Sequence, residues 1–171
     1  MCSSDLQVYT GSQKTATVTC SSGGAVSNIQ YAASSTAPTN IGTYAVTADC
    51  AANGNYAALT AASAGNFVIS SATPTLSITN SPQVYTGSQK TATVTCSSGG
   101  AVSNIQYAAS STAPTNIGTY AVTADCAANG NYAALTAASA GNFVISSATP
   151  TLSITNSPQV YTGSQKTATV T

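Results

Sequence analysis

Cysteine is the residue type in this chain with the clearest chemistry. Cys20 and Cys50 lie 30 positions apart, and Cys96 and Cys126 repeat this spacing. A disulfide that closes a loop of this length stabilises a fold by roughly 3 to 4 kcal/mol through chain entropy. We expect a disulfide within each pair, with two buried free thiols as the alternative. Four cysteines allow three pairings, which the sequence alone does not resolve, although pairing within identical repeats is the simplest. Cys2 is expected to be an unpaired thiol.

Residues for catalysis or metal binding are scarce. The chain has no histidine, and its carboxylates are Asp5, Asp49 and Asp125. Without a histidine base or paired carboxylates, we predict that the protein is not an enzyme. One aspartate per repeat cannot supply the six or more oxygen ligands that calcium requires. Zinc needs several closely spaced ligands, which are missing here. We therefore expect no metal and no cofactor, and we interpret Asp125 as a solvated surface carboxylate.

Charge and hydropathy argue against further functions and segment types. Lysine and arginine together number three, so no basic patch exists to neutralise phosphates, and nucleic-acid binding is not expected. No apolar run reaches the roughly 18 residues of a membrane span. A cationic start followed by an apolar stretch, the mark of a signal peptide, is also missing. If the protein is exported, we expect the signal to lie outside this sequence.

The elements that must position these residues recur in an identical repeat. Residues 7–82 reappear without a mismatch as residues 83–158, and a third copy starts at residue 159 and stops at residue 171. Such a period is typical of a tandem array. A short Ser-Ala-Thr-Pro-Thr connection occupies residues 71–75 and 147–151, where proline limits the freedom of neighbouring modules.

We therefore predict three parts in the array. Residues 7–71 form a first module that lacks its opening strand, residues 72–147 form a complete second module, and residues 148–171 are the truncated start of a third. Residues 1–6 interrupt the period: they read Met-Cys-Ser-Ser-Asp-Leu, where residues 77–82 read Ser-Ile-Thr-Asn-Ser-Pro. Cys-Ser-Ser-Asp-Leu is also the translation of TGC TCT TCC GAT CT, a sequencing-adapter end. We interpret residues 1–6 as an adapter scar, with a genuine N-terminal tail as the alternative.

The repeat has the pattern of a small all-β sandwich. Residues 91–96 and 119–126 alternate apolar and polar side chains, which predicts half-buried strands with the cysteines facing inward. Shorter alternating pairs surround residues 76–78, 105–107 and 143–145. Asn129-Gly130 predicts a tight type I′ turn. Residues 132–138 are rich in alanine, so one or two helical turns are the alternative there. The predicted fold class is all-β, with tandem immunoglobulin-like sandwich modules in an elongated array.

Four stretches resemble one known repeat family. They are Tyr-Thr-Gly-Ser at residues 85–88, Ser-Thr-Ala-Pro-Thr-Asn-Ile-Gly-Thr-Tyr-Ala-Val-Thr-Ala at 111–124, Asn-Tyr at 131–132, and Gly-Asn-Phe-Val-Ile-Ser at 141–146. Together they resemble the MBG-type repeat, found in tandem in large bacterial surface and secreted proteins of the adhesin kind. The resemblance implies an extracellular location and a repeat role. It carries over no catalytic or binding residue.

Two functional hypotheses follow. In the first, the array is a stalk or spacer of a bacterial surface protein, and its partners are the neighbouring repeats of the same chain. In the second, each module binds an extracellular glycan or host protein weakly and gains avidity from repetition. Exposed tyrosines among Tyr85, Tyr107, Tyr120 and Tyr132 would supply a sugar-stacking platform. Because the modules are identical, exchange of equivalent strands between them is also expected.

Overall fold

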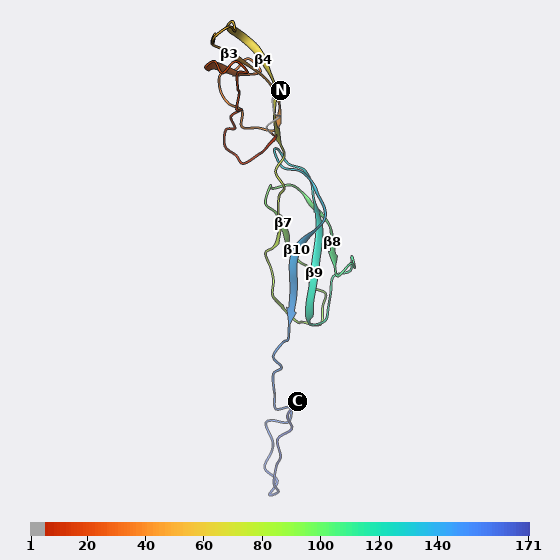
Figure 1. The fold of residues 1–171 in the computed structure, drawn as a ribbon. Coiled ribbons are helices and arrows are strands. Elements are labelled where there is room, and N and C mark those ends of the chain that lie inside the picture. Colours follow the sequence, from red (N-terminus) through yellow and green to blue (C-terminus); the bar gives the residue numbers. More distant parts are fainter. Residues whose placement is uncertain (1–5) are drawn as a thin grey trace.

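The protein is an elongated row of β-modules. The computed structural model describes residues 6–171, and these residues contain no helix. Figure 1 shows two strand-rich modules placed end to end, followed by a thin C-terminal segment. The described chain begins in the module at one end of the row and finishes in the segment at the other (Figure 1). The predicted all-β fold of tandem sandwich-like modules is confirmed. Residues 1–5, which include Cys2 and most of the expected scar, lie outside the described residues.

The second module consists of two packed sheets. The larger sheet has the order β6-β10-β9-β8, with β6 parallel to β10 and the other pairs antiparallel. The smaller sheet pairs β5 with β7 in antiparallel fashion, and β5 packs against β10. The strands are β5 (Leu76–Ile78), β6 (Gln83–Val84), β7 (Val94–Cys96), β8 (Val102–Tyr107), β9 (Gly118–Cys126) and β10 (Leu135–Ser146).

The core of this module lies between the two sheets. The period of two along β9 buries Val122, Ala124 and Cys126, as the alternation predicts. Phe143 packs its ring edge-on against Tyr107, with ring centroids 6.0 Å apart. The backbone N–H of Ala92 donates a 2.8 Å hydrogen bond to the Tyr107 hydroxyl, so this buried hydroxyl has a partner. The aromatic pair thus connects the larger sheet to the chain that leads into β7.

Two local expectations differ from the structure. The strand expected at residues 91–96 shortens to β7, because the side chain of Asn80 bonds the backbone that a neighbouring strand would otherwise bond. Its amide donates to the Thr91 carbonyl (2.8 Å), and its oxygen accepts from the Thr93 N–H (2.7 Å). The helical alternative at residues 132–138 is not adopted. Leu135 pairs with Cys126 at the start of β10, and Ala137 has a left-handed φ of 47°, which an α-helix excludes.

The first module repeats the larger sheet. Its order is β1-β4-β3-β2, formed by β1 (Leu6–Val8), β2 (Val26–Tyr31), β3 (Gly42–Cys50) and β4 (Leu59–Ser70). Leu6, expected to lie outside the module, is part of it, since it pairs in parallel with Val68. The corresponding position of the second module is Pro82, which lacks a backbone N–H and stands just before β6.

The smaller sheet is found only in the second module among the described residues. Residues 18–20 have the same sequence as β7, yet they form no strand. In the C-terminal segment, by contrast, the first two strand positions of the third copy begin to pair. Ile154 bridges Val170, and Ser153 and Thr171 exchange two backbone hydrogen bonds of 3.1 and 3.0 Å. This pairing reproduces the register of β5 and β7, in which Ile78 faces Val94.

Candidate functional site

Four of the five cysteines form one disulfide within each module. In the structure Cys96, in β7, is bonded to Cys126, the last residue of β9, and their Cα atoms are 6.2 Å apart. Cys20 and Cys50 form the corresponding bond, with a Cα separation of 6.1 Å. The Cys96–Cys126 bond ties the smaller sheet to the larger one. It therefore has a structural position inside the module and presents no thiol chemistry at the surface.

Asp125 has a structural role that the sequence did not reveal. It lies on the outward face of β9, as expected, but its carboxylate accepts hydrogen bonds from the backbone N–H of Ala137 (2.7 Å) and from the side-chain amide of Asn104. Asn104 and Ala137 both have positive φ, of 51° and 47°, and each lies in a bulge of a strand next to β9. These bonds hold the pKa of Asp125 below its ordinary value, the bond from Ala137 having the larger effect. Asp49 does the same in the first module.

The four tyrosines proposed as a sugar platform have packing roles or a place at a module end. Tyr107 is buried, and Tyr120 donates its hydroxyl hydrogen to the Asn116 carbonyl at 3.0 Å. Tyr132 packs against Tyr9 of the other module, and Tyr85 stays exposed at the far end of its own module. Among residues 6–171 no cluster of three or more potential metal ligands occurs, and no helix is long and apolar enough to cross a membrane.

The contacts between the two modules are the candidate functional site. The turn that contains Asn131 and Tyr132 projects from the second module and contacts the end of the first. We call these contacts the joint; its residues are Tyr9, Asn40, Ile41, Ala72, Asn131 and Tyr132. Its geometry combines side-chain and backbone hydrogen bonds with one aromatic pair.

Asn131 makes the polar contacts of the joint. Its side-chain oxygen accepts a 2.9 Å bond from the Ile41 N–H, and its amide donates a 3.0 Å bond to the Asn40 side-chain oxygen. Its backbone carbonyl accepts a 3.0 Å bond from Ala72, in the connection between the modules. The Ala72 carbonyl in turn accepts from the Ala133 N–H at 2.9 Å. The connection is thereby held as a short parallel bridge against the second module.

An aromatic pair and a buried proline complete the joint. The rings of Tyr9 and Tyr132 meet edge-on, with centroids 5.6 Å apart and an interplanar angle of 80°. Pro74, in the connection, is buried. Since proline also fixes its own φ, the connection has little freedom to bend. The joint therefore holds neighbouring modules in one orientation, and the row in Figure 1 is fixed by contacts on both sides of the connection.

The turn at this end of the second module could be predicted from the sequence, but its contacts with the first module could not. Asn129-Gly130 predicted a tight turn, and a turn between Asn129 and Tyr132 is present. The type I′ expectation is wrong: Gly130, with φ of 56°, is the one residue of the turn with positive φ, which is the sign pattern of type II′. This placement puts Asn131 and Tyr132 at the outer end of the module. A tyrosine directly after a turn asparagine was the only sequence signal for the joint.

Comparison with known proteins identifies one family. The MBG domain family matches residues 3–73 and again residues 74–149. No curated protein matches this chain, and no solved structure matches it. The two matches cover both modules and meet within the connection that contains Ala72 and Pro74.

Proposed function

Because the chain belongs to the MBG domain family and consists of tandem repeats of that domain, we propose that it is a structural stalk or spacer of a bacterial surface or secreted protein of the adhesin kind. The joint is the observation that carries this proposal. A spacer must keep its length, and it does so if each module is fixed to the next by more than a flexible connection. Repeats that contact only their neighbours extend an array by a constant step.

Two further features fit this role. An inter-sheet disulfide suits the oxidising environment outside the cell, where such bonds persist. The low charge, with three basic and three acidic residues, leaves few groups for salt-sensitive contacts with other molecules. We place the protein at the bacterial cell surface or outside the cell on these grounds and on the resemblance described above.

Solution scattering tests the spacer proposal. A compact body of 171 residues would have a radius of gyration of roughly 15 Å. Two modules of roughly 11 Å each, held end to end about 35 Å apart, give roughly 21 Å. We expect the larger value, and a constant increase in maximum dimension for each added copy of the repeat. A radius near 15 Å would contradict the proposal. A mucin or glycan-array pull-down with the oxidised chain examines the alternative of a weak multivalent binding module.

A further inference from the structure

Asparagine is followed by glycine at two places in this chain, Asn53-Gly54 and Asn129-Gly130. The second pair belongs to the turn that reaches the joint. Both residues of this pair are exposed, and a Cβ atom built on Gly130 would meet no other atom within 4 Å. The neighbouring side chain and water therefore reach the backbone nitrogen of Gly130 without a steric barrier.

The hydrogen bonds of the turn leave this nitrogen free. Two backbone bonds close the turn, from the Asn129 N–H to the Tyr132 carbonyl (3.2 Å) and from the Tyr132 N–H to the Asn129 carbonyl (3.0 Å). Neither bond involves Gly130, whose N–H bonds no backbone carbonyl among residues 6–171. The nitrogen that follows the Asn129 carbonyl is thus available to react with the Asn129 side chain.

We propose that Asn129 is a site of spontaneous deamidation, and that the reaction opens the joint. The Gly130 nitrogen loses its proton and bonds to Cγ of Asn129, while the bond from Cγ to Nδ2 breaks and Nδ2 takes up a proton and leaves as ammonia. The product is a cyclic imide, a succinimide. Water then opens this ring at either carbonyl, adding its hydroxyl to the carbonyl carbon and its proton to the Gly130 nitrogen, which gives aspartate or isoaspartate at position 129.

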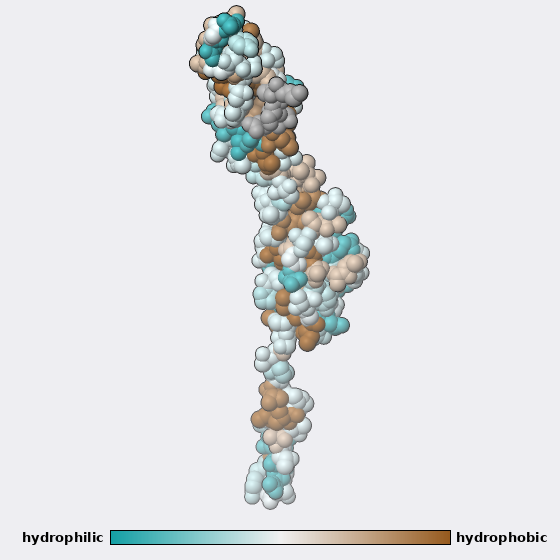
Figure 2. Space-filling model, viewed as in Figure 1, coloured by the Kyte–Doolittle hydropathy of each residue, from teal (hydrophilic) through white to brown (hydrophobic). Residues whose placement is uncertain are grey.

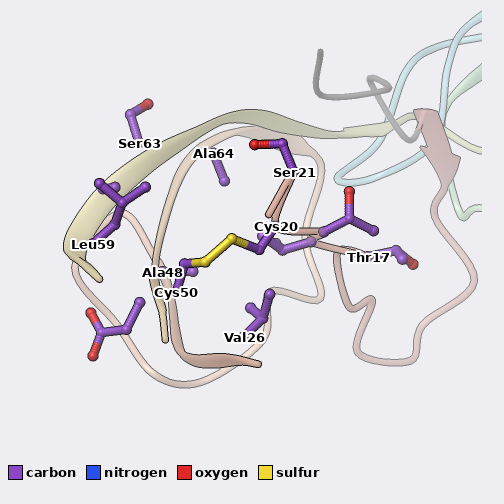
Figure 3. A pocket seen from close by; sticks show the side chains of 13 residues that line it. Thr17, Cys20, Ser21, Val26, Ala48, Cys50, Leu59, Ser63 and Ala64 are labelled. Atoms are coloured by element: carbon purple, nitrogen blue, oxygen red, sulfur yellow. A yellow bond between two sulfur atoms is a disulfide. The ribbon is translucent and has the colours of Figure 1, made fainter. Parts of the chain in front are cut away.

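The Asn129 amide also holds the turn to the loop that follows β7. Its Nδ2 donates a 2.7 Å hydrogen bond to the Ser98 carbonyl, and the first module repeats this bond. The Cys96–Cys126 disulfide joins the strands that lead into this loop and this turn, and Figure 3 shows the equivalent disulfide of the first module. Because the amide bond to Ser98 must break before Cγ approaches the Gly130 nitrogen, the folded chain reacts about two- to tenfold more slowly than a free peptide.

Neither product keeps the contacts of the original turn. A carboxylate has no hydrogen to donate, so it would face the Ser98 carbonyl as a second acceptor, and the hydrogen bond becomes a repulsion. Isoaspartate also carries the backbone through Cβ and Cγ, which lengthens the turn by a methylene group. The two bonds between Asn129 and Tyr132 then lose their geometry, and Tyr132 is displaced from its position in the joint.

Displacement of this turn removes the contacts that orient the modules. Asn131 supplies two side-chain hydrogen bonds across the joint, and Tyr132 supplies the aromatic pair. In Figure 2 the row narrows where the two modules meet, so few other side chains are placed to replace these contacts. The chemistry of the site is independent of the spacer function. Its effect on the length of an array rests on that proposed function, because an array with opened joints bends.

Mass spectrometry of the folded chain tests the reaction. Because residues 15–90 and 91–166 are identical, Asn53→Gln is introduced to distinguish the modules by mass and to leave a single Asn-Gly pair. We expect aspartate and isoaspartate to accumulate at position 129, faster at higher hydroxide concentration, because the attacking nitrogen must lose its proton. Asn129→Gln, whose longer side chain closes the corresponding ring far more slowly, should stay unchanged. No conversion at position 129, once a free peptide of residues 127–133 has converted fully, would overturn the proposal.

Calorimetry of the aged chain tests the effect on the joint. The Asn53→Gln chain is compared fresh and after position 129 has reacted, and the chain that also carries Asn129→Gln is aged for the same time. We expect the first melting transition of the reacted chain to fall as far as that of Asn131→Ala with Tyr132→Ala, and the Asn129→Gln chain to keep its transition. An unchanged transition in the reacted chain would refute the link to the joint. Scattering from the fresh chain separates the two proposals, because a compact fresh chain contradicts the spacer function while deamidation at position 129 still supports the site.

Discussion

Removing the joint from one side should uncouple the two modules, and the repeat supplies a matched control. The change is Asn131→Ala with Tyr132→Ala in the second module. The control is Asn55→Ala with Tyr56→Ala, which removes the same side chains from the same turn of the first module. In the control both side chains face solvent, so that variant reports the cost of altering the turn alone.

The expected loss follows from the contacts of the joint. Asn131 makes two side-chain hydrogen bonds across it, each worth about 0.5 to 1.5 kcal/mol. The edge-on tyrosine pair adds about 0.5 to 1.5 kcal/mol. Because the hydrogen-bonded groups are partly exposed to water, we take the lower half of the range, about 2 kcal/mol in total. A loss of this size shifts the ratio of joined to separated modules about thirtyfold.

Scanning calorimetry measures this loss as a change in melting temperature. For a module of this size, 1 kcal/mol corresponds to about 4 to 8 °C. We expect Asn131→Ala with Tyr132→Ala to lower the first transition by about 10 °C, because the first module loses its neighbour's support. The control pair should shift it by less than about 2 °C, at protein concentrations where the chain is monomeric. Equal shifts in the two variants would refute the joint as a source of coupling.

Two further outcomes are expected. Peptide mapping of the oxidised chain without reduction should recover Cys96 joined to Cys126, and recovery of both as free thiols would contradict the disulfide. Cys96→Ala with Cys126→Ala should lower the free energy of unfolding of the second module, measured in urea, by about 3 to 4 kcal/mol. Folding lowers the pKa of Asp49 and Asp125, so their stabilisation is complete above the unfolded-state pKa of about 4 and is lost as pH falls through the lower folded-state values. The melting temperature should therefore fall below about pH 4, and Asp49→Asn with Asp125→Asn should flatten that fall.

Much of one module could be predicted from its own sequence. The inward face of β9 follows from strict alternation, because a strand with one buried face requires a period of two. The outward position of Asp125 follows from the same period. The shortened β7 did not follow, since Asn80 bonds backbone groups that a neighbouring strand would otherwise have bonded. When a side chain makes the hydrogen bonds of a neighbouring strand, the alternation of apolar and polar residues does not change.

The joint could not be predicted from the sequence, for a different reason. Ile41 and Asn131 are 90 positions apart and belong to different copies of the repeat. In a repeat without mismatches, the same turn is exposed in one copy and bound in the next, so residue type alone cannot separate the two states. Asp125 is comparable, because its two partners lie in bulges of separate strands, and bulge positions depend on how three strands align.

The parallel pairing of β6 with β10 determines how a module would respond to tension. β6 directly follows β5, the first strand of the module, and β10 is the strand from which the chain leaves. Their pairing continues into the bond from the Tyr85 N–H to the Ser146 carbonyl, 2.9 Å long. A pull on the two ends slides these parallel strands along each other and loads their hydrogen bonds together. An antiparallel hairpin pulled at its open end instead loses its bonds one at a time. Because the bonds between the parallel strands are loaded together, each module should resist stretching more strongly than such a hairpin.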